Sequence, residues 1–405
     1  MEGRRFSSKD FLVIFIMLFN AASWVYLVRL LIGRYLATLN ASAYQTTITW
    51  TVFYISILLA CIAGALVSYT IRRLQFISAW VAISALVMLL PLMVGKVVLD
   101  DMVVYSSVWG TAIGIGLPTC LAYFANTTTE ENRGRIGGII SFITYTVIAS
   151  PKFIPQLSLV TNMMMSSEIL ALWRFSALVF VLFKPEEVVP LKLRRPIAIS
   201  SIFRWRSPIF YFIPWAIFCL VSQLDDPLLK AFLVGVPEFM GILSSIIFGL
   251  FMLVGGFMCD LIGRKPAATL CFALLGFRYA FLGLYPTMLY AKAFFVIVDQ
   301  IVLGIFVVLF GLTLWADLAP AGGGERFYMT GMLPVLLALV LEINLAPYLG
   351  YFSVSNAFLF AFVSIALAVF LTLLAPETLP ETVRERRKIE DYYKTVERVK
   401  LEEGS

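Results

Sequence analysis

The decapeptide GFMCDLIGRK at residues 256–265 joins two long apolar stretches, 238–259 and 267–286. Each stretch is about as long as the ~20 mostly apolar residues that an α-helix needs to cross the hydrocarbon core of a bilayer. Between them lie one acid, Asp260, and two adjacent bases. We therefore expect a short charged turn between two membrane helices.

The rest of the chain has the same apolar character. Of its 405 residues, 60% are hydrophobic and 14% are charged, and the mean hydropathy is +0.91. Soluble domains average ~45–50% apolar and ~25% charged residues. So little polar side chain could not cover a water-soluble enzyme of this size. The same numbers exclude a disordered chain, a coiled coil and a nucleic-acid-binding protein, despite the net charge of +6. We expect an all-α polytopic membrane protein.

Twelve segments are long and apolar enough to span a bilayer. They are 10–32, 45–69, 76–94, 102–125, 136–156, 167–183, 208–224, 238–259, 267–286, 291–316, 328–349 and 356–375. A long polar connection separates six spans from six. This predicts an N-terminal bundle over 1–183, a central loop over 184–207, a C-terminal bundle over 208–376 and a charged tail over 377–405. The tail is expected to be a solvated helix, with a membrane-surface or partner helix as the alternative.

Lys and Arg are unevenly distributed between the loops. With the N-terminus in the cytoplasm, 23 of the 31 bases lie in inner segments and five in outer ones. Cytoplasmic loops of membrane proteins carry an excess of Lys and Arg. A wrong number of spans would scramble this alternation, so the asymmetry supports twelve spans with both termini cytoplasmic. We expect a monomer in the lipid bilayer of the plasma membrane.

The two halves of the chain resemble each other at a nearly constant offset, which indicates an internal repeat. Three landmarks recur after 191 or 192 residues. Gly64-x3-Ser68-x3-Arg72-Arg73 corresponds to residues 256–265, Asn126 corresponds to Asp317, and Pro185-Glu186 corresponds to Pro376-Glu377. Each landmark follows the equivalent span of its half. A repeat of six spans is therefore expected.

Residues 256–265 match the pattern G-x-x-x-D-x-x-G-R-[RK] of the major facilitator superfamily, which the sequence resembles over its whole length. Asp317-Leu-Ala-Pro320, the Arg133-Gly134-Arg135 stretch and the Pro-Glu pairs are similar to its sugar-porter branch. The resemblance implies two six-helix bundles related by a pseudo-two-fold axis along the membrane normal. It also implies a substrate site between them near mid-membrane. Span five lacks the mid-helix Gln of sugar porters and span one lacks their acid, which argues against a sugar as the substrate.

The resemblance further assigns roles to charged residues on the inner side. The gating motif comprises Gly256, Asp260, Gly263, Arg264 and Lys265, with Arg72 and Arg73 from the first copy. Asp260 would accept hydrogen bonds from a neighbouring helix start or pair with Arg while the inner side is shut. The implied inner charge network comprises Arg133, Glu186, Asp317, Arg326 and Glu377. The alternative is a set of solvated loop charges, each contributing little to stability.

Ionisable residues within spans are functional candidates by default. The first half contains only bases and the second half mostly acids, so opposite signs could meet between the bundles. Asp299 and Glu342 lie away from span ends and are the candidates for proton coupling, because the chain has no His. Permanent pairing of both acids is the alternative. Arg29 lies about 180° around its helix from Asn20 and is expected to extend outward.

Polar and aromatic residues on the spans that the family places around its cavity form a candidate substrate site. They are Asn20, Ser23 and Trp24 on span one, Thr111 and Thr119 on span four, Gln223 and Asp225 on span seven, and Asp299 and Gln300 on span ten. For each of them, a hydrogen bond between neighbouring helices is the alternative.

We expect a secondary active transporter of a small polar solute that works by alternating access, with H⁺ as a candidate coupling ion. A non-transporting receptor or scaffold on the same fold, or an uncoupled facilitator, is the alternative. An enzyme is not expected, since the chain has no His, no HExxH and no GxxxxGK[ST]. The five cysteines lie in apolar stretches without CxxC spacing. We expect no metal, no cofactor and no nucleic-acid partner.

Overall fold

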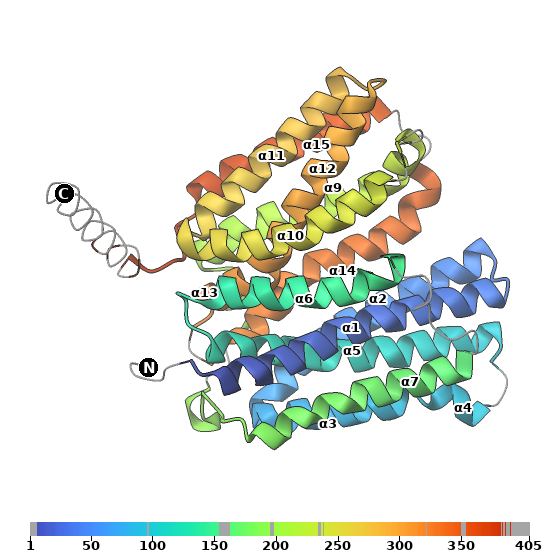
Figure 1. Ribbon diagram of the computed structural model, residues 1–405, viewed down its shortest axis with the longest axis vertical. Helices are drawn as coiled ribbons and strands as arrows, with labels where there is room; N and C mark the ends of the chain where they lie inside the picture. The colour runs from blue at the N-terminus through green and yellow to red at the C-terminus, as the bar shows by residue number, and fades with distance from the viewer. Residues whose placement is uncertain are drawn as a thin grey trace, which may run out of the picture.

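The computed structural model describes residues 6–94, 97–153, 163–194, 198–233, 236–237, 239–320, 322–349 and 354–381, together with 383, 385 and 389. These residues form helices joined by short turns, and no strand occurs among them (Figure 1). The prediction of an all-α polytopic fold is confirmed.

The first half of the chain contains six predicted spans in the expected order. Its helices are α1 (Ser8–Thr38), α2 (Ala43–Val67), α3 (Arg73–Val87), α4 (Leu90–Val94), α5 (Leu99–Thr127), α6 (Arg133–Phe153) and α7 (Met163–Ser176), the last continued by the 3-10 helix Ala177–Phe183. Capping boxes at Ser7 and Ser42 begin α1 and α2. Such side chains satisfy N–H groups that lack an intrahelical partner.

The second half follows the same plan. Its helices are α8 (Ile199–Ile202), α9 (Arg206–Phe232), α10 (Phe239–Leu261), α11 (Arg264–Leu284), α12 (Leu289–Val308), α13 (Leu314–Leu318), α14 (Gly324–Leu349) and α15 (Val354–Leu374). A π-helical turn, Leu309–Thr313, connects α12 to α13. Such turns inside helices are frequent at functional sites, and this one lies just before Asp317.

Eleven helices in the described part of the chain are long and apolar enough to cross a membrane. The remaining predicted span, 136–156, falls on α6 up to Phe153, and its last three residues lie outside the described part. Most of the predicted tail helix, 377–405, also lies outside it.

Each half of the chain forms most of one buried hydrophobic core. One is formed almost entirely by residues up to Phe180, and the other almost entirely by residues from Ile202 onward. Helix pairs that bridge the halves include α2 with α14, α6 with α10 and α5 with α14. In Figure 1 the halves meet near the labelled N-terminus and diverge toward the opposite end. The boundaries predicted for the two bundles remain a proposal.

Candidate functional site

Asp260, at the end of α10, caps the start of α6. Its fully buried carboxylate accepts hydrogen bonds from the backbone N–H groups of Gly134 at 2.9 Å and Arg135 at 2.8 Å. The side chains of Arg135 and Arg264 lie 3.3 and 3.5 Å from it. A carboxylate at a helix start satisfies unpaired N–H groups and interacts favourably with the helix dipole. Because α6 and α10 belong to different halves, this cap joins the halves.

The two motif glycines serve different purposes. A Cβ atom at Gly256 would lie 2.3 Å from the carbonyl oxygen of Gly134, so α6 and α10 cross in direct backbone contact. Gly263 has a φ of 113°, a conformation that favours glycine. A Cβ atom at Gly263 would also lie 2.5 Å from the carboxylate of Glu377. The first glycine permits helix contact, and the second permits the turn.

Asp317, in α13, holds two arginines from opposite halves. Its buried carboxylate pairs with Arg133 through one oxygen and with Arg264 through the other, the second contact being 2.7 Å. Arg264 also donates to the carbonyl oxygens of Cys259 at 2.8 Å and Glu130 at 2.7 Å. Removing one partner of a buried ion pair costs ~3–5 kcal/mol, because the other charge is left uncompensated. Asp317 is therefore a strong joint between the halves.

A third contact joins the start of α3 to the start of α14. Arg73 and Glu325 form a bidentate pair, with Nε–Oε1 2.5 Å and Nη2–Oε2 2.8 Å, and both side chains are almost fully buried. Tyr69 donates to the carbonyl oxygen of Gly322 at 3.0 Å. The guanidinium of Arg326 lies 5.0 Å from the centroid of the Tyr69 ring, a cation–π distance.

We name these contacts between the halves the charge lock, made by Asp260, Asp317, Arg133, Arg264, Arg73 and Glu325. The face of the molecule that carries them is the lock face. Its buried, hydrogen-bonded ion pairs hold the two halves together at this face.

Two glutamates cap helix starts at equivalent places in the halves. Glu377 accepts from the backbone N–H groups of Arg264 at 3.0 Å and Lys265 at 3.2 Å, at the start of α11. Glu187 accepts from the backbone N–H of Leu74 at 2.8 Å, at the start of α3. The internal repeat is thus visible as a repeated helix cap.

Two residues predicted to join these networks are exposed. One is Glu186, and the neighbouring Glu187 caps the start of α3. Arg72 is also exposed, because it precedes α3 in an extended conformation, and only Arg73 enters the charge lock. Glu187 also pairs with Arg194 at 3.1 Å, and burial, aided by Arg73, lowers the pKa of the Arg194 guanidinium.

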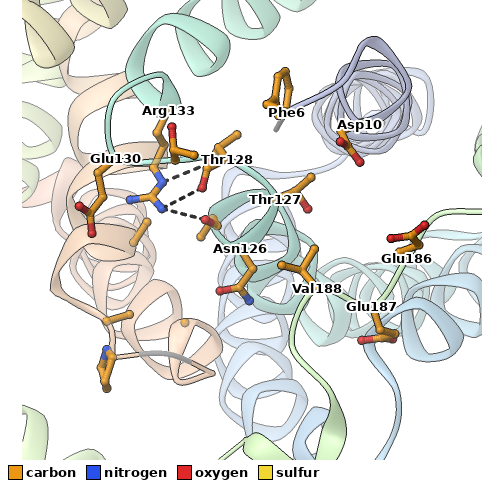
Figure 2. Close-up of a pocket in the computed structure, with 16 residues that line it drawn as sticks. Phe6, Asp10, Asn126, Thr127, Thr128, Glu130, Arg133, Glu186, Glu187 and Val188 are labelled. Carbon is orange, nitrogen blue, oxygen red and sulfur yellow. Dashed lines mark hydrogen bonds between the residues drawn. The ribbon is translucent and has the colours of Figure 1, made fainter. Parts of the chain in front are cut away.

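A cavity of about 670 Å³ lies beside the charge lock (Figure 2). Its charged lining residues are Asp10, Glu130, Glu186, Glu187 and Arg133. Burial raises the pKa of Glu130, and the nearby Asp317 raises it further, whereas Arg133 and Arg264 lower it. The cavity is acidic, and its one base is already paired with Asp317.

The α1 residues predicted to bind substrate face α7 instead of an open cavity. Asn20 donates to the carbonyl oxygen of Trp173 at 2.7 Å, and the Trp173 indole donates to Ser23 at 3.0 Å. Asn20, Ser23 and Trp24 are all buried. Asn20 and Ser23 thus bind a neighbouring helix of their own half, which is the alternative given for them, and a role of this stripe in substrate binding stays a prediction.

Arg174 organises this cluster. It donates to Asn20 Oδ1 and to Ser84 Oγ, each at 2.8 Å, and is fully buried. Its guanidinium lies 4.5 Å from the Trp24 ring and 4.0 Å from the Trp80 ring. Aromatic faces stabilise a desolvated cation. Arg174 thus ties α1, α3 and α7 together through neutral groups.

Three predicted site residues of the second half do come together. Arg278 on α11 pairs with Asp299 on α12 and donates to the Tyr279 hydroxyl at 2.9 Å. The Tyr279 hydroxyl donates to Asp225 on α9. Gln300 donates to Asp299 at 3.1 Å. We name this group the C-terminal network.

Glu342 lies at a separate place, between the halves. The guanidinium of Arg29 is 5.7 Å from the ring centroid of Tyr54, and Glu342 acts electrostatically on the same tyrosine. Asn344 on α14 donates to Thr51 on α2 at 2.9 Å. Arg29 and Glu342, which carry opposite charges, thus both act on Tyr54. Arg29 is exposed but lies beside Tyr54.

The remaining predicted site residues are dispersed. Thr111 is exposed and donates to the backbone of its own helix, Thr119 is buried, and Gln223 is half-buried. Tyr54 and Tyr279 were missed, and their only signal in the sequence was a hydroxyl within an apolar span. In the described part of the chain, no group of three metal-ligating side chains is placed to hold an ion.

The arrangement of helices is similar to that of known transporters. The human organic anion transporter MFSD10 matches with a TM-score of 0.66 and 16% identity over 90% of this chain and 99% of that one. A bacterial homologue of the iron transporter ferroportin, in its outward-facing state with soaked iron, matches with a TM-score of 0.71 and 13% identity over 91% and 99%. The chain has the major facilitator fold.

The proton:xylose symporter XylE, bound to 6-bromo-6-deoxy-D-glucose, shares the major facilitator fold at a TM-score of 0.64 and 15% identity, over 91% of this chain and 96% of that one. Its likeness is no greater than the other two, so the structures do not single out the sugar-porter branch. No protein-family model matches the sequence, and no curated protein matches it.

Proposed function

We propose that this protein is a secondary membrane transporter that moves a small polar solute by alternating access. The observation that carries the proposal is the charge lock. Its six side chains come from both halves, and it closes one face while the helices diverge toward the other (Figure 1). Alternating access requires such a joint, because one face must be held shut while the other admits solute.

The charge lock suits a reversible switch. Its two ion pairs between the halves, Arg133–Asp317 and Arg73–Glu325, are buried and hydrogen-bonded, so separating the halves exposes these partners to water together. The ferroportin homologue that shares the fold is described as outward-facing. We place the lock face in the cytoplasm, as the distribution of Lys and Arg indicates, so the conformation is outward-facing.

The solute is proposed to be zwitterionic or uncharged. The three similar structures are named as an organic anion transporter, a homologue of an iron transporter and a xylose symporter, so the fold by itself does not determine the substrate. Support comes from the chain, where Arg29 and Glu342 place opposite charges near one tyrosine between the halves. We also propose proton coupling through membrane carboxyl groups, with Asp299 and Glu342 as candidates.

Uptake into liposomes containing the purified protein tests the proposal. Zwitterionic, neutral and anionic solutes are supplied singly, with and without an inward proton gradient. We expect accumulation of a zwitterionic or neutral solute, abolished by a protonophore. A multiply charged anion as the sole transported solute contradicts the proposed substrate class. Transport that is indifferent to the gradient between pH 5 and 8 indicates an uncoupled facilitator.

A second measurement separates a transporter from a receptor or scaffold. The five native cysteines are buried, so single introduced cysteines can report accessibility. One cysteine replaces Asn344, which is exposed on α14, and the other replaces Ala316, which lines the cavity beside the lock. In a transporter, a transported solute changes the labelling rates of the two sites in opposite directions. A rigid receptor shows no such opposition.

A further inference from the structure

The C-terminal network places two carboxyl groups and one guanidinium in the interior of the second half. Arg278 and Tyr279 are at most 2% exposed, and Asp225 is 6% exposed. The Asp299 side chain, at 21%, is the most accessible member. The rings of Phe295 and Phe358 lie 5.5 and 6.4 Å from that of Tyr279, so the surroundings are apolar.

The two carboxyl groups of the network differ in their contacts with Arg278. Arg278 pairs directly with Asp299 through one nitrogen and donates to Tyr279 through another. Asp225 contacts the hydroxyl of Tyr279 and makes no ion pair with another described residue. The charged groups acting on Asp225 are Arg278 from α11 and Asp299 from α12, with the Tyr279 hydroxyl between.

This inventory leaves one excess negative charge if both carboxyl groups are ionised. Burying an unpaired charge in an apolar interior is far more costly than burying a neutral carboxyl group. A single proton makes the network neutral. Asp299 keeps its charge because Arg278 neutralises it directly, so the proton belongs to the other carboxyl group.

We propose that Asp225, which accepts a hydrogen bond from the Tyr279 hydroxyl, binds one exchangeable proton beside the Arg278–Asp299 pair. This deepens the proposed function, on which its role in coupling rests, by naming Asp225, in place of Asp299, as the carboxyl group of this network that binds the proton. The O–H bond forms on Asp225 Oδ1, while Tyr279 donates to Oδ2. When the O–H bond breaks, the proton passes to water and the ionised Asp225 is attracted to Arg278 through the Tyr279 hydroxyl, which changes the contact between α9 and α11.

The corresponding cluster of the first half supports this assignment by contrast. Arg174 is also fully buried, but its hydrogen-bond partners among the described residues are the neutral Asn20 and Ser84. It therefore offers no carboxyl group to titrate. Proton binding is proposed for the second half alone.

Infrared spectroscopy of the purified protein tests the proposal without a substrate. The C=O stretching band of protonated carboxyl groups is compared near neutral pH between the wild type and the variants Asp225→Asn, Asp299→Asn and Arg278→Gln. We expect a band equivalent to one carboxyl group in the wild type that disappears in Asp225→Asn. It should also disappear in Asp299→Asn, since the remaining acid then pairs with Arg278.

Arg278→Gln should double the band, because both acids lose their cation. Arg278→Lys keeps the charge and should keep a single band if Arg278→Gln fails to fold. Glu381→Gln, an exposed acid outside the network, is the control and should leave the band unchanged. A band that is identical in the wild type and in Asp225→Asn overturns the proposal.

Transport then separates this inference from the proposed function. If uptake remains proton-driven in Asp225→Asn as in the wild type, the assignment to Asp225 is wrong while the transporter proposal stands. If the spectra behave as expected but no solute is transported, proton binding by Asp225 is supported and the proposed function fails.

Discussion

Replacing Asp260 by asparagine removes a negative charge from the charge lock while nearly keeping the volume of the side chain. The carboxylate accepts from two backbone N–H groups at the start of α6, at 2.9 and 2.8 Å. An asparagine oxygen can serve only one of them, and its NH₂ group is a donor facing the other. The substitution therefore leaves a buried N–H without an acceptor.

The magnitude follows from these two contacts. A buried, unsatisfied donor costs ~1–3 kcal/mol, and converting the other bond from charged to neutral costs about 1 kcal/mol. The pair with Arg135 is omitted, because that side chain is 42% exposed and screened by solvent. Arg264 retains Asp317 as a partner. The closed lock should thus be weakened by about 2–4 kcal/mol, or roughly 30- to 700-fold in the equilibrium between closed and open states.

Labelling of Ala316→Cys by a membrane-impermeant thiol reagent measures this shift. Ala316 is buried and lines the cavity beside the lock. In vesicles that expose the lock face, Asp260→Asn should accelerate labelling at least ~10-fold, until the open state dominates. Arg72→Gln is the matched control, since Arg72 belongs to the same repeated motif but is exposed outside the lock. Equal labelling rates in Asp260→Asn and the control, at matched expression, would refute the reasoning.

Three further predictions concern the lock face. Gly134→Ala should destabilise the protein by ~1–3 kcal/mol, because its Cβ would lie 2.5 Å from a carboxylate oxygen and a carbonyl oxygen of α10. Gly241→Ala is the control, because the space around Gly241 is open, and thermal melting compares the two variants. Arg73→Gln and Glu325→Gln should each lower the free energy of unfolding by ~3–5 kcal/mol, and the double variant should lower it by much less than the sum. Denaturant unfolding of the two single variants and the double variant measures this, and additive losses would contradict a direct pair. The pKa of Glu130 is raised in the folded protein, so the protonated side chain favours folding and the ionised side chain opposes it. The stability gained from protonated Glu130 is fully present below its unfolded pKa of ~4.3 and is lost as pH rises through the higher folded pKa. Glu130→Gln should flatten this decline in melting temperature, and an unchanged pH profile would contradict the assignment.

The membrane architecture could be predicted from the sequence because the bilayer imposes a simple length rule. A span needs ~20 apolar residues whatever its neighbours, and the expected segments overlap the helices of the described residues. The motif at 256–265 led to the expectation that Asp260 would accept from a neighbouring helix start or pair with arginine, and Asp260 accepts from Gly134 and lies beside Arg264. Which helix start it would meet was not determined by the motif, because Gly134 belongs to the other half.

The partners across the bundle were decided only by the tertiary structure. Asp317 could have met any base of the inner loops, yet it joins Arg133 and Arg264. Glu186 and Glu187 are adjacent acids, and only the path of the loop decides which one caps α3. Charge alone cannot distinguish neighbours that point in different directions.

The direction of a membrane helix was the least predictable feature. In a soluble helix, the apolar stripe identifies the buried face. A membrane helix is apolar toward lipid as well as toward its neighbours, so that contrast is lost. Asn20 and Asp225 look alike in sequence, each a polar residue within an apolar span. Packing turns Asn20 toward Arg174 and brings Asp225 to Tyr279, because each helix rotates to satisfy its buried polar groups where water is absent.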